Sequence, residues 1–181
     1  MRALLLAALM MLGAGHAALG QDYDPYADMV ISDDISALPQ AVQDKRAQLI
    51  EAARSGDITS LKAIIDAQKS SPRVSFGDPE DAVAYLRTAS ADGEGIETLA
   101  ILRDLLEAPY AIIGATSEEP SYVWPYLAVI DATALTPAQM VDAYGLMPAE
   151  YAKELPEMGA WYYWRVFIEK NGAWSAFVAG D

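Results

Sequence analysis

The sequence has no cysteine, and its single histidine, His16, lies close to the N-terminus. The chain beyond residue 16 therefore carries neither a thiol nor an imidazole. These absences exclude Ser-His-Asp triads, Cys-His dyads, histidine-ligated zinc or copper sites and thiol redox chemistry from that part of the protein. The chemistry left to it uses carboxylate, Tyr, Lys or Ser side chains, or Ca²⁺ and Mg²⁺ held by oxygen ligands.

Basic residues are also scarce, because 12 Lys and Arg stand against 26 Asp and Glu, for a formal net charge of −14. A surface of this sign disfavours nucleic acid and anionic membranes as partners. The acids are spread unevenly, and residues 22–44 contain six Asp but no Lys or Arg. We interpret the excess as a solvated surface that keeps the protein soluble, with a site for a cationic partner as the alternative.

No hydrophobic run reaches the ~20 residues that a membrane-spanning helix needs. The run Ala3–Leu12 covers ten residues; it follows Arg2 and precedes a stretch rich in small residues. This is the layout of a secretory signal peptide, with cleavage after Ala17 or after Gly20. The sequence thus predicts that residues 1–20 are removed, that the protein is periplasmic or secreted, and that it does not insert into a membrane afterwards.

The remaining chain divides into two parts. We expect residues 21–37 to form an acidic flexible leader, or an arm lying on the surface, and residues 38–181 to form one domain. A hydrophobic content of 53% suits a packed core. Caps, prolines and apolar spacing predict helices that begin near Pro39, Asp57, Asp78, Gly95, Thr136 and Pro148. The helix after Gly95 is expected to bury Ile96, Leu99, Leu102, Leu105 and Leu106.

Aromatic residues are concentrated in the second half of the chain, where 13 of the 17 lie at or beyond Tyr110. Residues 110–114 are typical of a short strand, and residues 121–131 of an extended segment. Pro125 places the second segment off a central strand position. The order of these elements indicates an α+β fold, with N-terminal helices followed by a small antiparallel sheet that ends in a C-terminal hairpin.

The hairpin is predicted from Asn171-Gly172, which lies between two runs rich in β-forming residues. A two-residue loop in a type I′ turn would pair Lys170 with Ala173. In that register, one face is assigned to the core and carries Trp164, Val166, Ile168 and Phe177. The other face is expected to be partly exposed and carries Tyr163, Arg165, Phe167, Glu169 and Trp174.

That second face is one candidate binding surface. The rings of Tyr163, Phe167 and Trp174, beside Arg165, suit a sugar, a peptide or a partner protein. The alternative is that helices or the 122–126 segment cover this face, which would make the rings part of the core.

A second candidate surface lies in "YVWPY", where Tyr122, Trp124 and Tyr126 alternate and share one face of an extended segment. Such a platform suits stacking on a glycan, and with two carboxylates nearby it would suit glycoside hydrolysis. The acids considered for that role are Glu118, Glu119 and Asp131. The alternative is that the three rings pack in the core against the hairpin.

A metal site is considered at "DGEGIE", where Asp92, Glu94 and Glu97 surround two glycines. Clustered carboxylates in a flexible loop suit Ca²⁺, although the spacing is not that of an EF-hand. The alternative is a tight turn that leads into a helix with acids in its first turn. No other cofactor is expected.

Three segments resemble a group of small exported proteins from Gram-negative bacteria with no assigned activity. They are "YVWPYLA", the "DGEG" turn and the final "YWRV…NGAWSAFVAGD". The resemblance implies export and assigns no catalytic residue. The sequence therefore favours a periplasmic, non-enzymatic binding or interaction module for a protein or glycan partner in the cell envelope. Alternatives are a carboxylate-dependent enzyme acting on cell-wall glycan and a Ca²⁺-stabilised structural domain.

Overall fold

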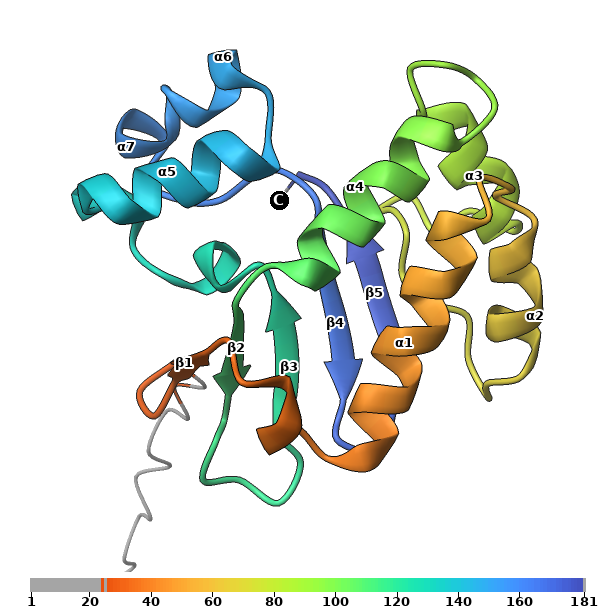
Figure 1. Ribbon diagram of the computed structural model, residues 1–181, viewed down its shortest axis with the longest axis horizontal. Helices are drawn as coiled ribbons and strands as arrows, with labels where there is room; N and C mark the ends of the chain where they lie inside the picture. Colours follow the sequence, from red (N-terminus) through yellow and green to blue (C-terminus); the bar gives the residue numbers. More distant parts are fainter. Residues whose placement is uncertain (1–23, 25, 181) are drawn as a thin grey trace, which may run out of the picture.

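The computed structural model describes residue 24 and residues 26–180, so the predicted signal peptide lies outside the described residues. The chain forms a five-stranded antiparallel sheet in the order β1-β2-β3-β4-β5, with helices packed on one face (Figure 1). This confirms the predicted α+β class, including the C-terminal β4-β5 hairpin. In this part of the chain, no helix is long and apolar enough to cross a membrane.

The strands are β1 Val30–Ser32, β2 Tyr110–Ile113, β3 Ser121–Trp124, β4 Arg165–Glu169 and β5 Trp174–Val178. The helices are α1 Gln40–Arg54, α2 Ser60–Asp66, α3 Ala82–Ala89, α4 Ile96–Glu107, α5 Pro137–Leu146, α6 Ala149–Ala152 and α7 Leu155–Met158. Short 3₁₀ turns occur at Ile35–Ala37 (η1), Tyr126–Val129 (η2) and Ala132–Ala134 (η3). Helices α1 and α4 lie across the sheet, and α5 to α7 form a group at one end of it (Figure 1).

The apolar stripes of α1 and α4 make the core on that face. Leu49 of α1 and Leu102 of α4 are fully buried. The other leucines of the α4 stripe, Leu99, Leu105 and Leu106, are at most 1% exposed. The expectation for Ile96 is wrong, since it is 56% exposed. At 3.6 residues per turn, Ile96 points about 120° away from the centre of the buried stripe.

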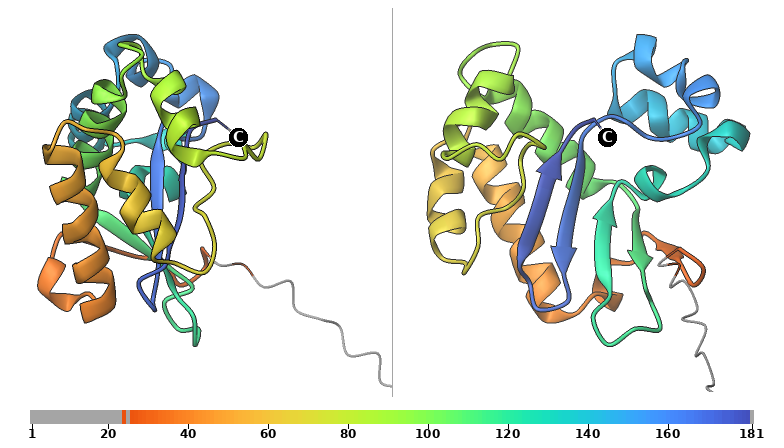
Figure 2. Two further views of the ribbon diagram at one scale, coloured as in Figure 1. Left: turned by 90° about the vertical axis from the view of Figure 1, so that its right-hand side faces the viewer. Right: turned by 180° about the vertical axis from the view of Figure 1, so that it is seen from behind.

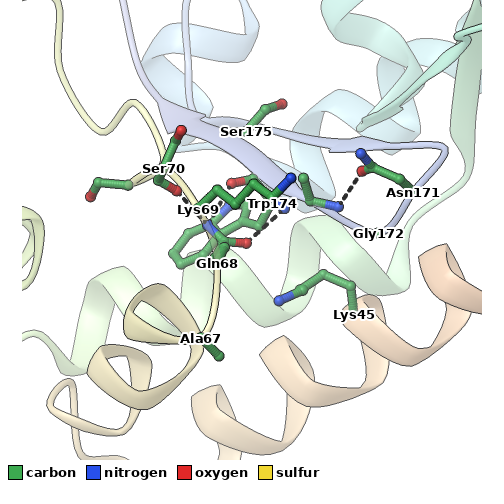
Figure 3. Close-up of a pocket in the computed structure, with 11 residues that line it drawn as sticks. Lys45, Ala67, Gln68, Lys69, Ser70, Asn171, Gly172, Trp174 and Ser175 are labelled. Carbon is green, nitrogen blue, oxygen red and sulfur yellow. Dashed lines mark hydrogen bonds between the residues drawn. The ribbon is translucent and has the colours of Figure 1, made fainter.

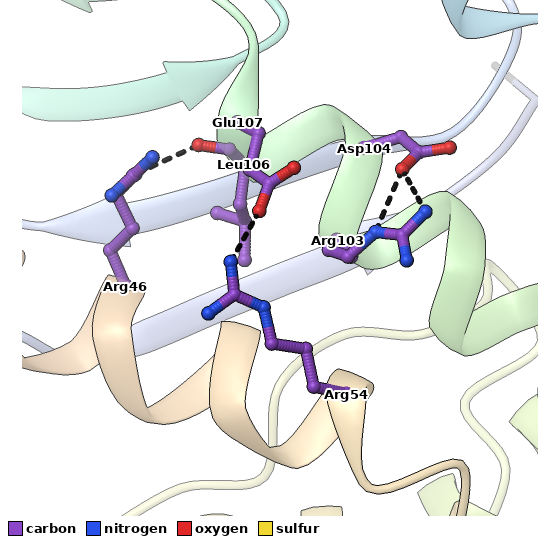
Figure 4. Close-up of polar contacts among 6 residues, drawn as sticks. All are labelled: Arg46, Arg54, Arg103, Asp104, Leu106 and Glu107. Atoms are coloured by element: carbon purple, nitrogen blue, oxygen red, sulfur yellow. Dashed lines mark hydrogen bonds and ion pairs between the residues drawn. The ribbon is translucent and has the colours of Figure 1, made fainter.

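Polar contacts on the outer side fasten α1 to α4 (Figure 4). The Arg46 Nε donates to the Leu106 carbonyl at 2.8 Å, close to the C-terminal end of α4. Arg54 and Glu107 form an ion pair at 2.9 Å that is open to solvent. The first contact satisfies a helix-end carbonyl, whereas the second, being exposed, contributes little to stability.

The leader is more ordered than a flexible segment. Residues 30–32 pair with β2 as the edge strand β1. The Asp28 carboxylate accepts a hydrogen bond from the backbone N–H of Thr116 at 2.6 Å. The β-branched pair Val30 and Ile31 suits this strand. The described part of residues 21–37 therefore belongs to the domain, closer to the surface-arm alternative.

The expectation that Pro125 keeps its segment off a central strand is wrong. Strand β3 is the third of five and pairs with both β2 and β4. It ends at Trp124, so the missing N–H of Pro125 is not required by the ladder. The Trp124–Pro125 peptide bond is cis. The next backbone N–H, that of Tyr126, donates to the Pro109 carbonyl at 3.1 Å.

The hairpin follows the predicted register at its open end and departs from it at the turn. Three predicted pairs are confirmed, namely Arg165 with Val178, Val166 with Phe177, and Phe167 with Ala176. The register then shifts by one residue, so that Ile168 lies opposite Trp174. Opposite residues share a face, and the shift moves Trp174 to the core side.

The prediction of a type I′ turn is wrong, because the loop has three residues rather than two. A type I′ turn needs positive φ at both Asn171 and Gly172. Gly172 has a φ of 83°, but Asn171 does not have a positive φ. The Gly172 N–H donates to the Glu169 carbonyl at 2.8 Å, and the Glu169 N–H to the Ala173 carbonyl at 2.9 Å. These bonds define a three-residue loop with glycine at its left-handed position.

Candidate binding groove on the open face of the sheet

Most of the aromatic residues proposed as contacts lie in the core instead. Tyr122, Trp124 and Tyr126 are 5%, 0% and 5% exposed. The ring of Trp124 packs against Tyr110 with centroids 5.4 Å apart. Their burial leaves no stacking platform at the surface, and the alternative of core aromatics holds. Trp174 is likewise 1% exposed, which corrects its assignment to the outward face.

Tyr163 belongs to a separate aromatic cluster at the start of β4. Its ring lies 6.1 Å from that of Tyr151 in α6 and 6.4 Å from that of Trp161. Burial raises the pKa of the Tyr163 hydroxyl, with Glu97 and Tyr151 adding to the effect. The residue is half-buried and packs toward the α5–α7 group rather than beside Phe167. The predicted trio of Tyr163, Phe167 and Trp174 is therefore not brought together.

The opposite face of the sheet has a different character. Among the described elements, no helix covers β2 to β5 on this side (Figure 2, right). Arg165 and Phe167 point to it from β4, and both are half-buried. These two residues are the members of the predicted contact set that lie on the open face.

The segment between α2 and α3 completes this face. Residues 72–76, here called the strap, run beside β5. The Arg73 N–H donates to the Ser175 carbonyl at 2.9 Å, and the Phe177 N–H donates to the Arg73 carbonyl at 2.8 Å. This parallel bridge places Arg73 and Phe76 next to the open face. The alternation of Arg73-Val74-Ser75-Phe76, with Val74 only 2% exposed, is the period-two signal that could have revealed it.

The strap and the hairpin enclose a groove of about 410 Å³, here called the Phe76–Phe167 groove. It is lined by Arg73, Phe76, Arg165, Phe167, Ser175, Ala176 and Val178. The ring of Phe76 is 52% exposed, and the Arg73 guanidinium lies 6.0 Å from its centroid. The groove thus combines two guanidinium groups with two phenyl rings, in a protein whose charge is otherwise strongly negative.

A carboxylate of β4 is engaged by its neighbours. Glu169, two residues beyond Phe167 on β4, accepts hydrogen bonds from the hydroxyls of Ser121 and Ser175. The two carboxylate oxygens of Glu169 are therefore already hydrogen-bonded, and so is the Ser175 hydroxyl. The other polar and aromatic groups that line the groove are the guanidinium groups of Arg73 and Arg165 and the rings of Phe76 and Phe167.

The "DGEGIE" loop uses its carboxylates to begin α4. Asp92 accepts the Glu97 N–H at 2.7 Å, the Ser90 hydroxyl at 2.7 Å and the Glu94 N–H at 2.6 Å. These bonds, led by that from Glu97, lower the pKa of Asp92 below its ordinary range. Glu97 in turn accepts the Ala91 N–H at 2.5 Å. Within residues 24 and 26–180, no group of three His, Cys, Asp or Glu is arranged to hold a metal ion.

The acids considered for glycoside hydrolysis are separated. Glu118 and Glu119 lie in the loop before β3, whereas Asp131 follows η2 beyond the other end of that strand. Asp131 caps η3 by accepting the Thr133 hydroxyl and N–H, and these bonds lower its pKa. A general acid needs a raised pKa, so the environment of Asp131 opposes that role.

Comparison with known proteins identifies no relative. No protein-family model matches the chain, and neither a curated protein nor a solved structure matches it significantly.

Proposed function

We propose that this protein is an exported, non-enzymatic binding module that holds a segment of a partner protein in the Phe76–Phe167 groove. The segment carries an apolar side chain flanked by carboxylates. The observation that carries the proposal is the pairing of Arg73 and Arg165 with two phenyl rings on a sheet face without a covering helix. Export is supported by the signal-peptide layout of residues 1–20.

Charge and shape favour this occupant. Guanidinium groups bind carboxylates in a planar, bidentate geometry, and phenyl rings bury an apolar side chain placed between them. Aromatic residues and arginine are the types that most often dominate binding energy at interfaces. The module therefore recognises an acidic segment locally, although the whole protein is negative.

A glycan fits the groove less well. Sugar recognition needs several convergent polar groups, and the Ser175 hydroxyl already bonds to Glu169. Hydrolysis of a glycan would further need two carboxylates facing one cleft. Neither requirement is met by the residues that line the groove.

The test is binding of short synthetic peptides of about six residues to the purified protein, followed by backbone amide NMR. One peptide has a central Phe flanked by Asp, the second replaces Asp with Lys, and the third replaces Phe with Ala. Only the first should cause saturable shifts in β4, β5 and the strap. Arg73→Gln and Phe76→Ala should each weaken binding about tenfold, a change of about 1.4 kcal/mol.

Arg54→Gln is the matched control, because this arginine is exposed on the opposite, helical side of the molecule. It should leave the dissociation constant unchanged. Equal binding of the Asp and Lys peptides, or an unchanged affinity in folded Arg73→Gln, would refute the proposal. Shifts in the same residues with chitin-derived oligosaccharides instead of the peptide would assign the groove to a glycan.

A further inference from the structure

The tip of the hairpin borders a second cavity, which is open to solvent and distinct from the groove. The loop Lys170–Gly172 lies against the start of α1, where a Cβ on Gly172 would come within 2.7 Å of the Ala41 carbonyl oxygen. The loop that follows α2 runs beside the first residues of β5. Between them lies a cavity of about 560 Å³, here called the tip cavity (Figure 3).

The acceptors in this cavity are largely satisfied by the protein itself. The Gln68 side chain bonds to the backbone of Trp174 through both its oxygen and its nitrogen. The Asn171 Oδ1 accepts the Ala173 N–H at 2.9 Å. Asn171 lines the cavity together with Lys45 and Lys69, and its amide nitrogen is a further hydrogen-bond donor at the rim.

In the part of the chain that the structure describes, neither lysine pairs with a carboxylate. Neither ammonium group forms a hydrogen bond or an ion pair with another described residue, whereas that of Lys62 pairs with Asp66 at 2.8 Å. The cavity lining contains no Asp or Glu, in a chain with 26 of them. Lys45 is partly buried, and this burial lowers the pKa of its ammonium group. Burying part of a cation without a partner costs free energy, and a bound anion would offset this cost.

We propose that the tip cavity binds a small polar molecule that carries a phosphate or carboxylate group. Lys45 and Lys69 hold the oxyanion from the two sides of the cavity, one from α1 and one from the loop after α2. The Asn171 amide donates to the same oxyanion or to an adjacent hydroxyl. Ser70 and Ser71, which also line the cavity, supply hydroxyls for the polar remainder of the ligand. This site is separate from the Phe76–Phe167 groove and does not depend on its occupant.

Asn171 provides a specific reporter, because it is the only asparagine in the sequence. Its side-chain NH₂ pair can be assigned in an amide NMR spectrum by its loss in Asn171→Ser. The purified protein is titrated to about 10 mM with inorganic phosphate, glucose 6-phosphate, glucuronate and glucose, a range that detects weak sites. Phosphate or carboxylate compounds should shift the Asn171 pair saturably, and glucose should not. A response to glucose 6-phosphate alone would specify a phosphate, and to glucuronate alone a carboxylate.

Lys45→Gln and Lys69→Gln should each weaken this binding at least tenfold, and the double variant should abolish it. Lys62→Gln is the matched control and should bind as the unmodified protein does. Arg73→Gln should also leave anion binding intact, which separates this site from the groove. The proposal fails if none of the anions shifts the Asn171 pair, or if the shift persists in the folded double lysine variant.

Discussion

The side-chain amide of Gln68 pairs with the backbone of Trp174, 106 residues away, as a neighbouring strand would. Its oxygen accepts the Trp174 N–H at 3.0 Å, and its nitrogen donates to the Trp174 carbonyl at 3.1 Å. Arg73 of the strap continues this pairing along β5. One edge of the sheet is therefore closed by residues that are not part of a regular strand.

Removing the Gln68 amide should destabilise the protein. Gln68→Leu leaves the Trp174 N–H and carbonyl without their partners, at a cost of about 1–3 kcal/mol in the free energy of unfolding. Chemical denaturation measures the change. Gln48→Leu is the control, because Gln48 is exposed on α1, and its effect should stay within about 0.5 kcal/mol. Equal effects of both substitutions would contradict a role for the Gln68 bonds.

Trp174 should behave as a core residue rather than as a contact residue. Its side chain is 1% exposed, and Trp174→Ala should lower the free energy of unfolding by about 3–5 kcal/mol. Tyr144→Ala removes an aromatic ring that is 50% exposed and should cost less than about 1 kcal/mol. A thermal melt of the Trp174 variant close to that of the unmodified protein would show that the ring is not in the core.

Two glycine-to-alanine substitutions should change stability in opposite directions. Gly172→Ala places a Cβ 2.7 Å from the Ala41 carbonyl oxygen at a φ of 83°. Strain and overpacking together should cost about 2–4 kcal/mol. Gly145 lies in α5 with nothing within 4 Å of the Cβ position, so Gly145→Ala should stabilise the protein by about 0.5–1 kcal/mol. Chemical denaturation checks both predictions: the midpoint of Gly172→Ala should lie below that of the parent protein, and the midpoint of Gly145→Ala above it.

Asp92 should contribute stability that is lost in acid. Hydrogen bonds from Glu97 and Ser90 lower the pKa of the folded carboxyl below its ordinary 3.8. The contribution is therefore complete above that ordinary pKa and declines as the pH falls toward the lower value in the folded state. Asp92→Asn should be less stable than the parent at pH 7, and the difference should shrink below about pH 4. A difference that stays constant with pH would exclude ionisation of Asp92 as its source.

The sequence predicts helix caps and strand faces well, because their signals lie within a few neighbouring residues. The Thr136–Gln139 capping box is present as expected, whereas the helix expected to begin near Asp78 begins three residues later, with Asp81 as its cap. The predicted core face of the hairpin is buried as well, including Val166, Ile168 and Phe177. Each of these depends on residues within a few positions of one another, or on a single strand period.

The departures come from contacts distant in sequence. The shift that turns Trp174 inward coincides with its pairing to Gln68, and the Asn-Gly signal contains no information about that partner. Arg73 and Phe76 join the groove only because the strap pairs with Ser175 and Phe177. Of the four guanidinium and phenyl groups in the groove, the two on Arg165 and Phe167 could be identified from the sequence, and the two on Arg73 and Phe76 could not.

The placement of β4 has a consequence for the timing of folding. Helices α1 and α4 pack on β4, which is synthesised more than 50 residues after α4. During synthesis, their leucine stripes cannot pack on β4 until residues 165–169 emerge. Contacts of such long sequence separation form slowly, and exposed stripes of this kind are recognised by chaperones. The core on this face is thus completed only when the last part of the chain has been made.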